Sequence, residues 1–308
     1  MTQMSTTLFF DRAISQMGVT QDRLAKTQMQ LSSGKELIRP SDAPAEASAV
    51  SRLKSAIQRQ QSYTDTINTV RDKLSQQETA VKSANDVLIR IKELTIQAAN
   101  DTYGAEGRKL INIEVKELRD QLLSLANTQD VNGNYIFSGS RAGKQAYATD
   151  GSQPLTYLGD QTINQVGVGD ERTVRDGRAA TQPFARTIRT GADGESQSIG
   201  FFEVIQDLST ALDSNDMTGI QRAVSEVGDM QFGMSESLAS IGASMNTLDT
   251  QLSLAEQNTL RLKGTLSQME DVDYTDAITK MNKDMLALQA AQSSFAKISQ
   301  LNLFNYIK

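Results

Sequence analysis

The chain has 308 residues, no His, Cys or Trp, and a formal net charge of −6. The missing Cys excludes disulfides and thiolate chemistry, and the missing His excludes an imidazole base, a Ser-His-Asp triad and histidine metal ligands. The acidic balance disfavours nucleic acid as a partner, because surfaces that bind nucleic acid are basic.

The N-terminal residues contain only three consecutive apolar side chains, Leu8 to Phe10. A secretory signal needs an apolar run of roughly 7–15 residues, and a membrane span needs roughly 18. We therefore expect neither a cleavable signal nor membrane insertion. Aromatic residues make up only 5% of the chain, so we expect few large anchors in its core.

Glycine and proline divide the sequence into three parts. Residues 131–200 hold 11 of the 20 Gly, whereas residues 1–130 and 201–308 consist mostly of helix-forming residues. The flanks therefore predict long helices, and the middle predicts turns and strands. The expected fold class is mainly α with a β insertion: an elongated helical bundle with coiled-coil-forming N- and C-terminal helices and a small Gly-rich β domain.

The N-terminal helix carries a stripe in alternating steps of four and three residues, which is the period of a coiled coil. Gly34 ends the pattern, and Arg39-Pro40 favours an extended backbone. The stripe consists of Phe10, Ile14, Met17, Gln21, Leu24, Gln28 and Leu31.

Two further helices follow in this half of the chain. The first begins near Pro44, which is tolerated in a first turn, with Asp42 as a candidate N-cap. Its apolar residues recur at multiples of seven as far as Leu88 and predict a helix of about 55 residues, or about 80 Å. The second helix is expected over residues 105–128.

The middle of the chain reads as a small β insertion. Asn132-Gly133 is a strong turn signal, and the charges that follow are balanced. No stretch has the pattern of a binding pocket. Short strands are expected near residues 145–147, 155–158, 161–168 and 172–174.

The C-terminal side has the clearest coiled-coil period, from Ile241 to Met269. The acidic segment 270–277 interrupts it, and Asp273, Thr275 or Asp276 can cap a new helix there. The stripe then resumes with Ile278, Met281, Met285, Leu288, Gln292 and Phe295, and an apolar end containing Phe304 follows.

No motif in the chain carries chemistry. Gly34-Lys35 resembles the end of a phosphate-binding loop, but Met29 and Glu36 stand where that loop needs Gly and Ser or Thr. The acidic run 270–276 lacks the Gly and the Glu that an EF-hand loop requires. We therefore expect no enzyme activity, no metal and no cofactor.

The two ends of the chain resemble those of the bacterial flagellin superfamily. Residues 23–53, RLAKTQMQLSSGKELIRPSDAPAEASAVSRL, are similar to its N-terminal signature, and residues 271–308 are similar to its C-terminal signature. PSDAPA at 40–45, NGNYIFSGS at 132–140 and the ending LNLFNYIK are more similar to the hook-associated members than to filament flagellin.

This resemblance implies a structural adaptor in the extracellular flagellum, exported unfolded by the flagellar type III apparatus. It implies terminal helices that are disordered in the monomer and pair during assembly. The implied partners are hook-associated protein 1, flagellin, neighbouring copies of the chain and an export chaperone. A short filament-forming flagellin is the alternative, and a coiled-coil scaffold unrelated to flagella would instead have ordered ends in the monomer.

The terminal stripes predict an assembly interface, because a single helix of this kind is marginal in water and needs a partner. We expect that partner to be both the other end of the chain and neighbouring subunits, with simple intrachain pairing as the alternative. Gln21, Gln28 and Gln292 either fix the register or face solvent. Phe10, Ile14, Met17, Leu24 and Leu31 are expected to face Ile278, Met281, Met285, Leu288, Phe295 and Phe304.

These patterns predict three domains. Residues 1–40 with 265–308 form a terminal coiled-coil assembly domain, and residues 41–134 with 201–264 form a helical rod domain. Residues 135–200 form a β-rich insertion, which the resemblance places on the outside of an assembly.

Overall fold

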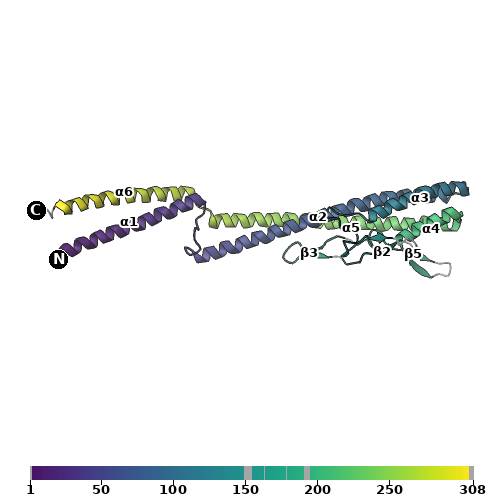
Figure 1. Ribbon diagram of the computed structural model, residues 1–308, viewed down its shortest axis with the longest axis horizontal. Helices are drawn as coiled ribbons and strands as arrows, with labels where there is room; N and C mark the ends of the chain where they lie inside the picture. The colour runs from purple at the N-terminus through teal and green to yellow at the C-terminus, as the bar shows by residue number, and fades with distance from the viewer. Residues whose placement is uncertain (1, 149–154, 163, 178, 191–194, 305–308) are drawn as a thin grey trace. The chain divides into compact units, whose positions relative to one another are not determined.

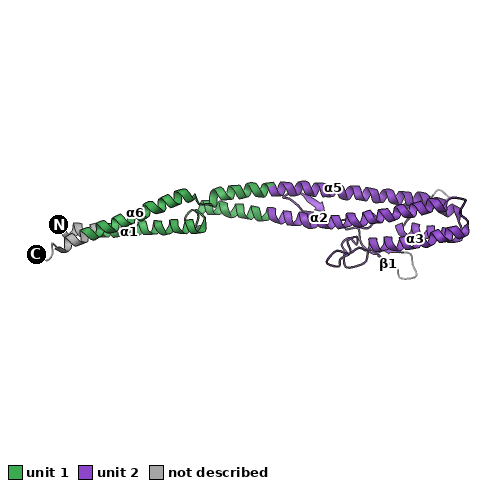
Figure 2. Ribbon diagram, turned by 90° about the horizontal axis from the view of Figure 1, so that it is seen from above, with its two compact units in different colours: residues 1–59, 257–308 green, residues 60–256 purple. Residues whose placement is uncertain are grey.

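The computed structural model describes residues 2–148, 155–162, 164–177, 179–190 and 195–304. The chain forms two compact units (Figure 2). The terminal unit comprises residues 1–59 and 257–308, and the central unit comprises residues 60–256. The β insertion belongs to the central unit, while the three-domain division expected from the sequence stays a prediction.

Six helices account for most of the described residues, and short antiparallel strands lie between α3 and α4 (Figure 1). This confirms the expected class, mainly α with a β insertion. No helix in the described ranges is both long and apolar enough to cross a membrane. The helices are α1 (Thr2–Ser33), α2 (Pro44–Ala98), α3 (Ala105–Ala126), α4 (Phe201–Ser214), α5 (Met217–Glu270) and α6 (Tyr274–Phe304).

In the part of the insertion that the structure describes, each strand pairs with its neighbour in the sequence, β1 with β2, β3 with β4, and β5 with β6. The first four overlap the expected segments, whereas the sequence analysis did not predict the last two. Their bounds are β1 (Tyr147–Ala148), β2 (Thr156–Tyr157), β3 (Gln165–Gly167), β4 (Thr173–Arg175), β5 (Thr187–Thr190) and β6 (Ser196–Ile199).

Helix α2 has the expected length of 55 residues and begins at Pro44. The expected N-cap is wrong, because the Asp42 carboxylate lies 3.1 Å from Lys26 Nζ. The first turn of α2 instead begins at Ala43, whose carbonyl accepts a hydrogen bond from the backbone N–H of Ala47. A lysine at 3.1 Å offers the carboxylate a charged partner in place of the orphan N–H groups of the helix.

The core of the central unit lies between antiparallel stretches of α2 and α5, with α3 and α4 packed beside them. Lys92 Nζ on α2 donates to Gln231 Oε1 on α5 at 2.9 Å, and Asn112 Nδ2 on α3 donates to the Ser209 carbonyl on α4 at 3.0 Å. Buried residues recur along both long helices at steps of three and four, the spacing of helices that pack along one face. Leu74, Val81, Leu88 and Ile91 of α2 and Ile220, Val227, Met234 and Ile241 of α5 are buried in this way.

An aromatic cluster joins the β insertion to the helices. Phe184, 1% exposed, contacts the rings of Phe137 and Phe201 edge to face, with centroids 5.8 and 5.2 Å away. Tyr147 on β1 packs edge to face on Phe202 of α4 at 4.8 Å. The buried aromatic residues of the described chain are few, and they are concentrated at this one place.

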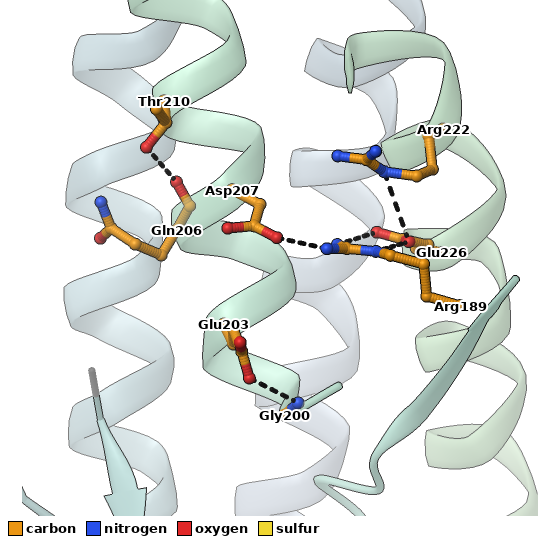
Figure 3. A network of polar contacts seen from close by, with 8 residues as sticks. All are labelled: Arg189, Gly200, Glu203, Gln206, Asp207, Thr210, Arg222 and Glu226. Atoms are coloured by element: carbon orange, nitrogen blue, oxygen red, sulfur yellow. Dashed lines mark hydrogen bonds and ion pairs between the residues drawn. The ribbon is translucent and has the colours of Figure 1, made fainter. Parts of the chain in front are cut away.

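A polar network fixes the β5–β6 hairpin to α4 and α5 (Figure 3). The Arg189 guanidinium on β5 binds both carboxylate oxygens of Glu226 at 2.6 and 2.9 Å, and it binds Asp207 at 2.6 Å. The hydrogen bonds to Glu226 and then Asp207 raise the pKa of Arg189 above its ordinary value. A two-pronged contact of this kind fixes direction as well as distance, so it orients β5 against both helices.

Candidate assembly interface

Helices α1 and α6 lie side by side and antiparallel within the terminal unit (Figure 1). The rings of Phe10 and Phe295 pack edge to face, with their centroids 5.3 Å apart. At the other end of the pair, the backbone N–H of Val272 donates to the Gly34 carbonyl at 3.1 Å. The N-terminal part of α1 and the C-terminal part of α6 therefore lie together at one end of this pair.

The least exposed side chains of α1 and α6 form a seam, which we define by residues that recur every three or four positions. Large apolar residues in this seam alternate with small or polar ones. Thr20 and Thr27 are buried there without loss, because each hydroxyl donates to the carbonyl four residues earlier, at 2.9 and 3.0 Å. The seam consists of Phe10, Ala13, Met17, Thr20, Leu24, Thr27 and Leu31 on α1, and Ala277, Met281, Asp284, Leu288, Ala291 and Phe295 on α6.

The seam contains every second position of the stripes expected from the sequence. The structure brings together Phe10, Met17, Leu24 and Leu31 on α1 with Met281, Leu288 and Phe295 on α6. Ile14, Ile278 and Met285 lie outside the seam and are 55%, 45% and 43% exposed. The side chain of Phe304 lies outside the described residues.

The difference is a shift of one residue at alternate positions. Each of these three exposed residues comes directly after a small or polar residue of the seam. Ile14 follows Ala13, Ile278 follows Ala277, and Met285 follows Asp284. Small side chains let two helix backbones approach closely, so the seam follows them rather than the larger neighbours. The signal that could have located the seam is the regular recurrence of Ala and Thr, which hydrophobicity alone does not detect.

The displaced residues form a flanking stripe, which we define as Ile14, Gln21, Gln28, Ile278, Met285 and Gln292. All six occupy the same heptad position, and all are exposed. Because the two helices are antiparallel, equivalent heptad positions border the same side of the seam. The pair therefore presents a partly apolar surface that nothing in the described chain covers.

A second group of contacts, which the sequence did not predict, lies where α1 ends and α6 begins. We call this end of the pair its root. The Glu270 carboxylate at the end of α5 accepts hydrogen bonds from Lys35 Nζ and Lys54 Nζ, both at 2.8 Å. The Glu36 N–H donates to the Glu270 carbonyl at 2.8 Å, and Lys35 forms an antiparallel bridge with Asp271. We call Lys35, Lys54 and Glu270 the clasp.

Both ion pairs of the clasp depend on the negative charge of Glu270, a residue that is only 8% exposed. Hydrogen bonds from Lys35 and then Lys54 hold the pKa of Glu270 below its usual range. A carboxyl with a lowered folded-state pKa stabilises the fold above its unfolded pKa and loses that contribution as pH falls through the folded value. We therefore expect the clasp to be closed near neutral pH and to open in acid, as the pH falls through the folded-state pKa of Glu270.

The break before α6 is a capped helix start, as the sequence predicts. Asp273 Oδ1 accepts hydrogen bonds from the N–H groups of Thr275 and Asp276, at 2.9 and 3.2 Å. Gly34 ends α1 on the opposite side with a φ of +70°, a conformation that favours glycine. The end of α1 and the start of α6 thus each have a defined backbone geometry.

These features define a class: a mainly helical protein whose two ends pair as antiparallel helices and whose middle segment carries a β insertion. A model of the bacterial flagellin N-terminal helical region matches residues 4–142, and a model of the C-terminal helical region matches residues 224–307. The chain belongs to the bacterial flagellin family.

Individual relatives extend this similarity over nearly the whole chain. Flagellar hook-associated protein 3 of Salmonella typhimurium is 26% identical over 98% of this chain and 98% of its own length. The flagellar filament 41 kDa core protein of Borreliella burgdorferi is 22% identical over 92% and 93%. A solved flagellar hook-associated protein of Vibrio parahaemolyticus shares the fold, with a TM-score of 0.66 at 20% identity, over 75% of this chain and all of that one.

Proposed function

We propose that this chain is a structural adaptor of the bacterial flagellum that joins the hook to the flagellin filament. The observation that carries the proposal is the terminal pair, whose flanking stripe is exposed on helices that match both ends of the flagellin family. The similarity to a hook-associated protein over 98% of both chains favours the junction over the filament. The role is structural and not catalytic.

In this proposal the flanking stripe contacts neighbouring copies. One surface of a subunit then contacts a different surface of the next subunit. Such head-to-tail contacts continue around a ring or along a helical assembly. In the free chain the terminal pair opens and closes, and it becomes fully ordered when it binds. The proposed partners are hook-associated protein 1 on one side, flagellin on the other, and an export chaperone before secretion, with the extracellular flagellum as the location.

Deletion of the gene in its own bacterium tests this function. We expect cells that keep their hooks, lack filaments and release flagellin into the medium, and a plasmid copy of the gene should restore filaments. Normal filaments in the deletion strain would overturn the proposal.

The filament-forming alternative is supported by the 22% identity to a filament core protein over 92% of the chain. It predicts that the purified chain grows long polymers on filament seeds. A junction protein should add to seeds without continued growth, so the length of the polymers in electron micrographs separates the two functions.

Paired substitutions distinguish the seam from the flanking stripe. Ile14→Ser should leave exchange protection of α1 unchanged and reduce the number of filaments per cell, because the lost apolar contact weakens subunit affinity by about tenfold, or about 1.4 kcal/mol. Met17→Ser should reduce both, because Met17 lies in the seam. Amide hydrogen exchange and filament counts measure the two effects, and Ser15→Ala, on an exposed position of the same helix, is the control. Full filament numbers in Ile14→Ser would remove the stripe from the interface.

A further inference from the structure

The seam between α1 and α6 is weak on its own. Every second position is Ala, Thr or Asp, so the alternate layers bury little apolar surface. Asp284 is a charged residue at a partly buried position of α6 and adds no large apolar side chain to the seam. Pairing of two such helices needs a further source of free energy.

The root of the pair supplies contacts of a stronger kind. Lys35 and Lys54 both reach one oxygen of Glu270 at 2.8 Å, and the Glu270 side chain is 10% exposed. Charge-assisted hydrogen bonds are about twice as strong as neutral ones. Two backbone hydrogen bonds flank them, from Glu36 to Glu270 and from Val272 to Gly34, at 2.8 and 3.1 Å.

The position of these contacts in the chain matters as much as their strength. They join the segment directly after α1 to the segment directly before α6. When these two segments are joined, the last turn of α1 and the first turn of α6 lie side by side, and the remaining seam forms between neighbours. Each helix is then held at a high effective concentration for the other.

We propose that Glu270 is a positioning residue that, through the clasp, brings α1 and α6 together and sets their register. With the clasp closed, the pair forms from its root toward the chain ends. With the clasp open, the two helices lose their common origin and separate. This inference rests on the proposed function only for its consequence in assembly, and the pairing itself is measured on the free chain.

Neutralising Glu270 tests the clasp directly. In Glu270→Gln the amide oxygen is a weaker acceptor for two ammonium groups, so α1 and α6 should exchange amide hydrogens at least about tenfold faster, or about 1.4 kcal/mol. Glu270→Asp keeps the charge and should restore part of the protection. Glu256→Gln, an exposed carboxylate on the same helix, is the matched control and should change nothing.

A reversible tether separates positioning from general stabilisation. Lys35 and Asp271 are paired in the antiparallel bridge, and the chain has no Cys of its own. In Lys35→Cys/Asp271→Cys/Glu270→Gln, the oxidised form should protect α1 and α6 at least as well as the unaltered chain. The reduced form should return to the low protection of Glu270→Gln.

Each outcome of this experiment decides the question. Protection of α1 and α6 that falls in Glu270→Gln and returns with the oxidised tether supports the inference. Equal protection of α1 and α6 in all variants overturns it. Peptides of the central unit should exchange at the same rate throughout, and a general loss of protection there would show that Glu270 is merely structural. A deletion strain with normal filaments would instead overturn the function while leaving the clasp intact.

Discussion

Replacing Arg189 with Ala should destabilise the central unit by about 3–5 kcal/mol, the range for removing one partner of a buried ion pair. The Arg189 side chain is 17% exposed and that of Glu226 is 6% exposed. Without the guanidinium, Glu226 keeps Arg222 at 3.7 Å, which is too long for a good hydrogen bond. The buried carboxylate then lacks the two donors that compensate its desolvation.

The measurement is hydrogen exchange of α4 and α5 peptides in the central unit. Arg90→Ala is the control, because its ion pairs with Glu93 and Glu114 are exposed and such pairs contribute about 0–1 kcal/mol. Arg189→Met/Glu226→Leu should cost less than Arg189→Ala, since it leaves no unpaired charge at Glu226. A loss of under about 1 kcal/mol in Arg189→Ala would contradict a buried role for this network.

The long helices could be predicted because their information is local. Along α2 and α5 a single apolar period continues for many turns, and the helix ends have their own signals at Pro44, Gly34 and Asp273. Length and period together exclude a strand. This is why α2 agrees with its expected length of 55 residues.

The seam of the terminal pair was predicted only in part. Hydrophobicity ranks Ile14 above Ala13 and Ile278 above Ala277, yet the smaller residue of each pair faces the partner helix. The choice depends on how closely the two backbones approach, which one helix cannot specify. The clasp was missed for a similar reason, because Lys35, Lys54 and Glu270 meet only after the chain has folded back on itself.

The insertion was the least predictable part of the chain. Strands β5 and β6 lack a clear apolar alternation, with the sequences TIRT and SQSI. Their place depends on Arg189, whose partners Asp207 and Glu226 lie on two helices farther along the chain. The aromatic cluster likewise draws Phe137, Phe184 and Phe201 from separate segments.

Replacing Phe184 with Ala should cost about 3–5 kcal/mol, the range for a buried Phe in a core. Phe184 is 1% exposed and contacts Phe137, Tyr147, Phe201 and Phe202. Its removal leaves a cavity and breaks the edge-to-face pairs that join the insertion to α4. We expect the largest loss of exchange protection in β1 and in the first turns of α4.

Phe232→Ala is the matched control for this substitution. Phe232 is 73% exposed on α5, so its truncation should change stability by less than about 0.5 kcal/mol. Urea unfolding followed by hydrogen exchange of central-unit peptides compares the two variants. If Phe184→Ala were as stable as Phe232→Ala, the aromatic cluster would not hold the insertion, and polar contacts such as those of Arg189 and Lys73 would have to account for its attachment. If only Phe184→Ala loses protection, while α1 and α6 keep theirs, the insertion and the terminal pair are held by separate interactions, as their division between the two units requires.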